Sequence, residues 1–329
     1  MQPDQQDIRL LGPQIPVGQA GLRIDQYLSR NFLFLSREKW ISRLRAREVY
    51  VDGRPVKPAY RLRSGSQLSY FAPASREPEV DANLSTVWEQ DGVAVMYKPA
   101  NLPMHEGGAY RVNTFHQCLH QVKGRSWSSV HRLDRETSGL VLCADTSAAR
   151  ETLSAGLRER KTQKTYYAIV HGQCQKSHWR VDQPLGPIDN TLFRLKHGVT
   201  PNGLPSQTDF EVLDSTGAYS LLKVKPLTGR THQIRLHAAF SGHPLVGEKK
   251  YFPDESIYLE RLEKGFTARV EAAALFDRLC LHAAELEFAL PGHPAEMQQV
   301  VTELPQDMED IWQQLVRNSS SRFSHCSLT

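Results

Sequence analysis

Long apolar runs are missing from this sequence. No stretch approaches the roughly 18 consecutive apolar residues that a membrane-spanning helix needs. The first residues, MQPDQQDIRLL, do not place an apolar stretch after a basic one, so they do not resemble a secretory signal. These two absences predict a cytoplasmic protein that does not bind a membrane.

Cysteine is scarce, and no Cys-x-x-Cys pair occurs. An odd number of scattered thiols argues against a disulfide framework and against a zinc site. We expect these thiols to be reduced and mostly buried. The five cysteines stand at positions 118, 143, 174, 280 and 326.

Charge is nearly balanced overall but unevenly distributed. The 329 residues carry a formal net charge of +4, yet residues 21–71 hold 11 Lys and Arg against 4 Asp and Glu. That segment therefore carries +7, which leaves −3 for the rest of the chain. The excess is typical of a module that binds a polyanion, but a solvated basic face explains it equally well.

The order of polar and apolar segments divides the chain, whose length predicts about two domains. In the basic segment, Ser36 has the character of a helix N-cap, and Asp52-Gly53 between short strand patterns predicts a hairpin turn. Pro and acidic residues mark a linker before a larger body. We predict a flexible segment over 1–19, a small α/β module over 20–72, a linker over 73–84, a body over 85–300 and a C-terminal tail over 301–329 that ends in disorder.

The larger body mixes strand and helix patterns without a regular βαβ repeat, which indicates an α+β fold. Strand candidates include VAVMYKP, GLVLCAD, KTYYAIVHG and LLKVKPL. Helices are predicted near 113–122, 147–160 and 231–241, and an amphipathic helical excursion over 255–277.

The densest group of charged residues is VHRLDRETSG, residues 130–139, just before an apolar strand. Asp134 stands between Arg132 and Arg135 in this predicted loop. A guanidinium nearby would hold the carboxylate ionised and available as a nucleophile. A surface ion-pair cluster with Thr137 capping a turn explains the same pattern.

Two further segments carry chemistry-bearing side chains. In GRTHQIRLH, Arg230 and Arg235 near a helix start could bind a phosphate or a carboxylate. Its two histidines have no further ligands in the pattern, so a metal site is not expected. In KTYYA, strand alternation sends Tyr166 and Tyr167 to opposite faces, and packing is the commoner role for a tyrosine in a strand.

Taken together, HRLDRETSG, KTYYAIVHG, GRTHQIRLHAAFSGHPLVGEKKY and LCLHAAELEF resemble, in order and spacing, the RluA family of pseudouridine synthases. VMYKPANLPMH resembles the opening Lys-Pro motif of that family, and the resemblance covers about residues 85 to 292. Residues 21–71 are similar to the S-four-like RNA-binding domain. The resemblance implies the pseudouridine synthase fold, with a mixed, mainly antiparallel central sheet flanked by helices and loops.

The resemblance also implies an activity and its residues. It implies that uridine in ribosomal or transfer RNA becomes pseudouridine, without a cofactor, metal or obligatory protein partner. Asp134 would be the catalytic carboxylate, Tyr166 would contact the base, and Arg235 would pair with Asp134. Arg132 would help support a flipped nucleotide. The other residues assigned to RNA binding are Lys98, His131 and Arg230 in the body and Arg37 and Arg43 in the basic module.

Two departures from the family pattern stand out: Val-Gly-Glu at 246–248 replaces the more usual Val-Gly-Asp, and residues 254–277 are longer than in many relatives. We expect neither to touch the chemistry. The main alternative is an RNA-binding protein of the same fold without activity. A nucleoside hydrolase is a further alternative, whereas a zinc deaminase would need His-x-Glu and Pro-Cys-x-x-Cys motifs that are absent.

Overall fold

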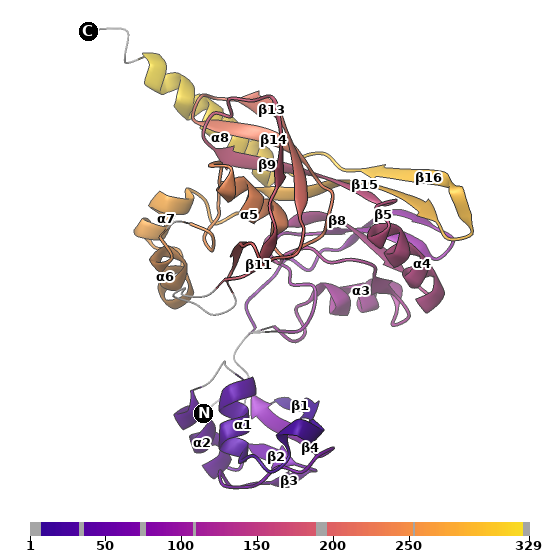
Figure 1. Ribbon diagram of the computed structural model, residues 1–329, viewed down its shortest axis with the longest axis vertical. Helices are drawn as coiled ribbons and strands as arrows, with labels where there is room; N and C mark the ends of the chain where they lie inside the picture. The colour runs from indigo at the N-terminus through magenta and orange to yellow at the C-terminus, as the bar shows by residue number, and fades with distance from the viewer. Residues whose placement is uncertain are drawn as a thin grey trace, which may run out of the picture. The chain divides into compact units, whose positions relative to one another are not determined.

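The computed structural model describes residues 8–32, 36–72, 77–107, 110–188, 196–252 and 254–324. The chain divides into two compact units, which Figure 1 draws and which are described one after the other. The first comprises Met1–Pro78 with Gly107–Arg111, and the second comprises Glu79–Glu106 with Val112–Thr329.

Two short helices form one side of the first unit: α1 (Ile24–Asn31) and α2 (Arg37–Arg45). The Ser36 hydroxyl accepts a hydrogen bond from the Lys39 N–H at 3.3 Å, which confirms the predicted N-cap. Trp40 of α2 is buried, and its ring meets that of Tyr70 edge to face at 5.5 Å. The apolar sides of both helices therefore close a small core against a sheet.

That sheet has four strands in the order β1-β4-β2-β3. Asp52 and Gly53 connect two of them with φ angles of 49° and 77°, the left-handed pair that a two-residue hairpin requires. The prediction of a flexible segment over 1–19 is wrong for its second half, because Ile8 to Gln14 pairs antiparallel with β4. Residues 1–7 lie outside the described residues. The strands are β1 (Ile8–Gln14), β2 (Val49–Val51), β3 (Arg54–Pro55) and β4 (Gln67–Ala72).

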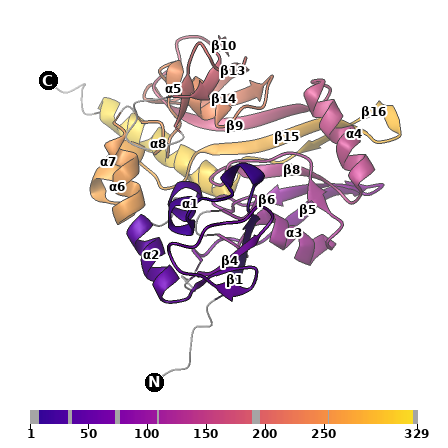
Figure 2. The same ribbon diagram turned by 60° about the horizontal axis from the view of Figure 1, so that its bottom comes forward.

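A ten-stranded sheet organises the second unit, with the path β10-β13-β14-β9-β15-β8-β6-β5 and with β16 and β7 on branches (Figure 2). Its pairs are antiparallel except β8 with β15, so the predicted mixed, mainly antiparallel α+β fold is confirmed. The strands are β5 (Ser85–Gln90), β6 (Val93–Lys98), β7 (Ser128–Ser129), β8 (Ser138–Ala144), β9 (Gln163–His171), β10 (His178–Asp182), β13 (Gln207–Ser215), β14 (Tyr219–Pro226), β15 (Leu281–Leu290) and β16 (His293–Val301); β11 (Leu185–Pro187) and β12 (His197–Val199) pair separately.

Both faces of the large sheet are covered, because its strands alternate two sets of apolar side chains. On one face, Met96, Val141 and Ala168 pack with residues of α3 and α5 in one core cluster. On the other, Leu142 and Phe288 pack with α4. The helices are α3 (Phe115–Lys123), α4 (Ser147–Arg158), α5 (Gln233–Phe240), α6 (Ser256–Lys264), α7 (Ala268–Ala274) and α8 (Gln306–Ser324).

The C-terminal region is more ordered than predicted. α8 occupies residues 306–324, where we expected a tail with a disordered end. Met308, Ile311, Trp312 and Leu315 recur at helical spacing and are buried against Ile169 of β9. Residues 325–329 lie outside the described residues.

None of the described helices combines the length and apolarity needed to cross a bilayer. Four cysteines carry free thiols, and three of them are buried: Cys118, Cys143 and Cys280, with Cys174 half-buried. Cys326 lies outside the described residues.

Candidate active site

Asp134 lies on the loop that leads from β7 into β8. The Lys98 ammonium donates to the Arg135 carbonyl of this loop at 3.1 Å. The loop then enters β8, whose seven residues are all buried. Gly139 has a φ of 118°, and a Cβ there would collide with the Ala283 backbone of the neighbouring strand β15. Glycine is therefore required where the loop joins the sheet, and a rigid strand holds Asp134 in place.

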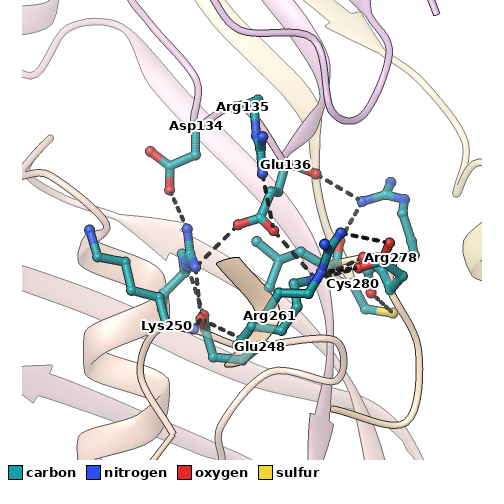
Figure 3. Close-up of polar contacts among 12 residues, drawn as sticks. Asp134, Arg135, Glu136, Glu248, Lys250, Arg261, Arg278 and Cys280 are labelled. Atoms are coloured by element: carbon teal, nitrogen blue, oxygen red, sulfur yellow. Dashed lines mark hydrogen bonds and ion pairs between the residues drawn. The ribbon is translucent and has the colours of Figure 1, made fainter. Parts of the chain in front are cut away.

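Arg235 of α5 faces the Asp134 carboxylate, with 3.5 Å between Nη1 and Oδ2. Its side chain is 4% exposed. Nη2 lies 3.4 Å from Oε2 of Glu136. Nε and Nη2 each donate to one oxygen of Glu248 at 2.7 Å. One guanidinium thus bridges three carboxylates, those of Asp134 and Glu136 on one loop and that of Glu248 on another (Figure 3).

Glu248 is a residue of this site that the sequence analysis missed. It is fully buried, and its Oε1 also accepts hydrogen bonds from the backbone N–H groups of residues 249, 250 and 251 at 2.9, 2.8 and 3.2 Å. Burial alone would raise the pKa of Glu248, but the charge and hydrogen bonds of Arg235 lower it below its ordinary value. The Val-Gly-Glu departure, which we expected not to touch the chemistry, therefore places a carboxylate on Arg235, the residue that faces Asp134.

Glu136 has a counter-ion of its own. Lys249 Nζ lies 3.3 Å from Glu136 Oε1 and donates to the Asp277 carbonyl at 2.8 Å. Burial would raise the pKa of Glu136, but the positive charges of Arg235 and Lys249 outweigh it and lower the pKa to about 2. The carboxylate is thus ionised at neutral pH and holds Arg235 from a second side.

His232 borders Asp134 on the opposite side, with 3.7 Å between Nε2 and Oδ1. Its Nδ1 shares a short hydrogen bond with the Tyr251 hydroxyl. Burial lowers the pKa of His232 to about 4, so the imidazole is neutral at neutral pH. If Nδ1 accepts the Tyr251 proton, Nε2 carries an N–H that faces the Asp134 carboxylate.

Gln233 fixes the turn before α5 and was also missed. Its Oε1 accepts hydrogen bonds from the Thr228 hydroxyl at 2.7 Å and the Arg230 N–H at 3.0 Å. Its Nε2 donates to the Gln207 carbonyl at 2.8 Å and the Thr208 hydroxyl at 2.9 Å. The buried Gln233 amide therefore ties the start of α5 to β13 and to the turn before the helix. These bonds fix where α5 presents Arg235.

Asp134 opens onto a cavity of about 260 Å³, called the base cavity below. Its walls combine an apolar part, which includes Leu133, Tyr166 and Ile234, with the polar turn 228–233. A flat, polar-edged ring of the size of uracil suits such a lining. The lining residues are His131, Arg132, Leu133, Asp134, Thr137, Lys164, Tyr166, Pro226, Thr228, Gly229, Arg230, Thr231, His232, Gln233, Ile234, Arg235 and Leu281.

Tyr166 lies on β9 and is 7% exposed. It lines the base cavity, whereas Tyr167 does not. Burial, with the charge of Asp134, raises the pKa of the Tyr166 phenol. The phenol is therefore protonated at neutral pH. The structure thus brings Asp134, Tyr166 and Arg235 together at one cavity, as the resemblance implied.

Of two other residues assigned to RNA binding, Lys98 lies inside the protein and His131 is half-buried. Lys98 is fully buried and donates to the carbonyls of Pro99 and Leu102 at 2.8 Å as well as to Arg135. Its three N–H groups are thus occupied, and an RNA contact is not available to it, so that prediction is wrong. Nε2 of His131 accepts from the Leu142 N–H at 3.2 Å, and burial lowers the pKa of His131 to about 3.

The other predicted contacts are closer to the surface. Arg132 and Arg230 are exposed at the base cavity. Arg37 donates to the buried Asp25 at 2.7 Å, so it also ties α2 to α1. Arg43 lies 3.9 Å from Glu48 and is 18% exposed.

A second cavity of about 390 Å³ shares Asp134, His232 and Arg235 with the base cavity. Its other walls are polar and include Lys250 and, from α6, Tyr258 and Arg261. Two residues of the stretch 254–277, which we expected not to touch the chemistry, therefore line a cavity that reaches Asp134. Among the described residues, no group of three or more His, Cys, Asp or Glu side chains could hold a metal ion.

Known families and proteins match both units. The RNA pseudouridylate synthase family matches residues 92–240, and the S4 domain matches residues 22–68. Ribosomal large subunit pseudouridine synthase C of Escherichia coli (strain K12) is 33% identical over 293 residues, 84% of this chain and 88% of the relative. The protein of the same name from Vibrio parahaemolyticus is 31% identical over 294 residues, 85% of this chain and 88% of the relative.

Solved structures agree. Human RNA pseudouridylate synthase domain containing 1 has a TM-score of 0.53 at 26% identity, and covers 73% of this chain and 97% of its own. Human RNA pseudouridylate synthase domain containing 4 has a TM-score of 0.55 at 24% identity, and covers 70% of this chain and 92% of its own. At this identity it supports the fold alone. The chain therefore belongs to the RluA family of RNA pseudouridine synthases, with an N-terminal S4 domain, and it converts uridine in RNA to pseudouridine.

Proposed function

We propose that this enzyme modifies uridines of ribosomal RNA, that of the large subunit in particular, and that Asp134 acts at C1′ of the target nucleotide. The observation that carries the catalytic part is the position of Asp134 at the junction of two cavities, with Arg235 3.5 Å from its carboxylate. The choice of RNA is supported by the names of the two bacterial relatives. The cytoplasm, predicted from the sequence, is where the proposal places the reaction.

The two cavities suit the two halves of a nucleotide. The base cavity has the partly apolar walls that a uracil ring needs, whereas the second cavity is polar and rimmed by Arg135, Lys250 and Arg261. Because C1′ joins base to ribose, a uridine with its base in one cavity and its ribose phosphate in the other places C1′ beside Asp134. The uridine must leave its stack to reach this position, and the exposed Arg132 is suited to support the opened RNA.

The reaction balances without an added reagent. The N1–C1′ bond breaks and its electron pair leaves with the base, the uracil turns, and C5 bonds to C1′. C5 then loses a proton and N1 ends protonated, so no net oxidation, reduction or hydrolysis occurs. Asp134 supplies the carboxylate at C1′, either as a nucleophile or through stabilisation of the developing positive charge. Arg235 aims that carboxylate, and the buried carboxylates of Glu136 and Glu248 aim Arg235.

Tyr166 contributes contact with the base in this proposal. Since its pKa is raised by burial, the phenol keeps its proton at neutral pH and is a poor base for the C5 proton. Its ring, on the strand β9, limits how the detached uracil can turn.

The N-terminal unit supplies RNA affinity in this proposal. Its S4 match and its net positive charge suit phosphate contacts, which position RNA without reading its bases. We place this unit at Ile8 to Pro78 and the catalytic unit at Glu79 to Ser324, because β1 joins the first sheet and α8 packs on β9; this extends the predicted 20–72 and 85–300, and residues 73–76 of the predicted linker 73–84 lie outside the described residues.

The test is a pseudouridine map of ribosomal and transfer RNA from cells with and without the gene, repeated with purified protein on unmodified transcripts. We expect one or more large-subunit uridines to lose the modification without the gene and to regain it in vitro. Asp134→Asn should bind the same RNA but lower turnover by at least about 10⁴-fold. Sites confined to transfer RNA would overturn the choice of RNA, and wild-type turnover by Asp134→Asn would overturn the catalytic assignment.

A further inference from the structure

A third cavity, of about 430 Å³, adjoins the base cavity. It shares His131, Lys164, Pro226, Thr228 and Gly229 with the base cavity, and neither Asp134 nor Arg235 lines it. Its lining contains no carboxylate and three cationic side chains, those of Arg160, Lys164 and Lys225.

Lys164 lies at the boundary of these two cavities. It is two residues before Tyr166 on β9, so both side chains extend from the same face of the strand. A Cβ added at Gly229 would lie 3.9 Å from the Lys164 Nζ, which places the ammonium beside the turn 228–229. Among the described residues, no hydrogen bond or ion pair engages this ammonium. Burial lowers the pKa of Lys164 below its ordinary value, because desolvation disfavours the charged form.

Lys225 and His131 supply further N–H groups to this cavity, whereas the Thr228 hydroxyl is engaged by Gln233 and Gln207. Lys225 is opposite Asp209 across β13 and β14, but Arg180 already engages both oxygens of Asp209 at 2.5 and 2.7 Å. Nδ1 of His131 is buried and has no hydrogen-bond partner among the described residues. Because its Nε2 accepts from a backbone N–H, Nδ1 carries the proton. Arg160 follows the C-terminus of α4, where a cation is favoured in any case, so it adds little to the argument.

We propose that this third cavity binds a phosphodiester of the RNA next to the target uridine, and that Lys164 is its main ligand. The inference rests on the proposed function, because the flipped base must occupy the adjoining cavity. A half-buried ammonium without a counter-ion costs folding free energy, and an anion that arrives with the substrate offsets that cost. The phosphate then fixes the strand on one side of the base cavity while Asp134 meets C1′ on the other.

The first test measures RNA affinity over a series of NaCl concentrations for the full chain, with an unmodified large-subunit ribosomal RNA transcript as the probe. We expect Lys164→Gln to weaken binding about 10-fold or more, as loss of a charged hydrogen bond does. The slope of log affinity against log salt should fall by about 1, because one phosphate is no longer neutralised. Lys164→Arg should keep both values. The control is Lys223→Gln, two residues before Lys225 on β14 and outside the cavity lining.

A second test uses a short RNA that carries the mapped uridine, with a neutral methylphosphonate in place of each flanking phosphate in turn. At one of these linkages, the methylphosphonate should weaken RNA binding by the wild-type protein. The same methylphosphonate should not weaken RNA binding by Lys164→Gln any further. Equal losses for wild type and variant at every linkage would overturn the proposal. So would a Lys164→Gln enzyme with unchanged affinity and salt slope but lower turnover, which would assign the ammonium to charge on the uracil.

The melting temperature of a Lys164 variant distinguishes phosphate binding by Lys164 from a purely structural role. Lys164→Met removes an uncompensated charge and fills the same space, so the melting temperature of the free protein should hold or rise while RNA affinity falls. A lower melting temperature with unchanged RNA affinity would show a structural lysine. Failure of the proposed function is distinguishable, because wild-type protein would then leave the transcript unmodified whatever happens at Lys164.

Discussion

Glu248 engages Arg235 through both carboxylate oxygens at 2.7 Å, and one of those oxygens also accepts three backbone N–H bonds. Arg235 is the residue that faces Asp134. Glu248 therefore joins the loop 247–251 to the catalytic carboxylate without touching the substrate, and it acts as a positioning residue. Gly247 precedes it with a φ of 78°, where a Cβ would collide with the Arg278 carbonyl.

Replacing Glu248 with glutamine should lower both stability and turnover. The substitution leaves the buried Arg235 with one fewer counter-ion, which costs on the order of 3–5 kcal/mol of unfolding free energy when a buried pair is broken. A displaced Arg235 no longer aims Asp134, so kcat should fall by about 100-fold while KM for RNA changes little. Urea unfolding and steady-state kinetics measure the two effects.

Glu248→Asp is the matched control. It keeps the charge but shortens the side chain by one methylene, so it cannot reach Arg235 and the three N–H groups equally well. We expect losses between those of wild type and Glu248→Gln. Wild-type kcat in Glu248→Gln would contradict the positioning role.

Local signals predicted much of the fold. The cap at Ser36 and the turn at Asp52-Gly53 are fixed by contacts within a few residues, so the sequence shows them. α8 was missed because its polar end, NSSSRF, obscures the spacing of Met308, Ile311 and Leu315. β1 was missed because its pairing partner, β4, lies about 60 residues away in the chain.

The residues of the site also fall into those that a sequence pattern indicates and those that it does not. Asp134, Tyr166 and Arg235 come from three segments, and only the ordered set of motifs indicated that they meet. Glu248 and Gln233 have no local signature, because they act on Arg235 and on backbone groups distant in sequence. Lys98 was misassigned for a related reason: it was assigned to RNA because it belongs to the Lys-Pro motif, but three carbonyls surround its ammonium.

Lys98 offers a prediction that separates loop positioning from RNA contact. Lys98→Met removes the donor to the Arg135 carbonyl, which lies next to Asp134. We expect kcat to fall by about 10- to 100-fold through misplacement of the loop, with RNA affinity and its salt dependence unchanged. A smaller salt slope in a binding titration would instead restore the RNA-contact role that the sequence suggested.

Glu136 predicts a dependence of stability on pH. Its pKa in the folded protein is about 2, below the ordinary value of 4.5, because Arg235 and Lys249 outweigh burial. The folded state therefore favours the charged form, and the stabilisation is complete above about pH 5 and is lost as the pH falls through 4.5 toward 2. The contribution is on the order of 3 kcal/mol.

The measurement is urea unfolding of wild type and Glu136→Gln between pH 7 and pH 3. The difference in unfolding free energy should be largest near neutrality and should shrink as the pH falls. Glu151→Gln, at an exposed pair with Arg158, is the control and should change stability by less than about 1 kcal/mol. A difference that stays constant with pH would mean that Glu136 acts through packing and not through charge.

The N-terminal unit should add RNA affinity without a part in the chemistry. Lys39, Arg45 and Arg47 are exposed on or just after α2, and none of them lines the cavities around Asp134. Changing all three to glutamine should lower the slope of log affinity against log salt by up to about 3, one for each phosphate that is no longer neutralised, and leave kcat at saturating RNA unchanged. Arg37 is left in place because it also neutralises the buried Asp25, so its loss would confound folding with binding. If the triple variant kept the wild-type salt slope, the basic charge of this unit would be a solvated surface, and RNA affinity would have to come from the catalytic unit.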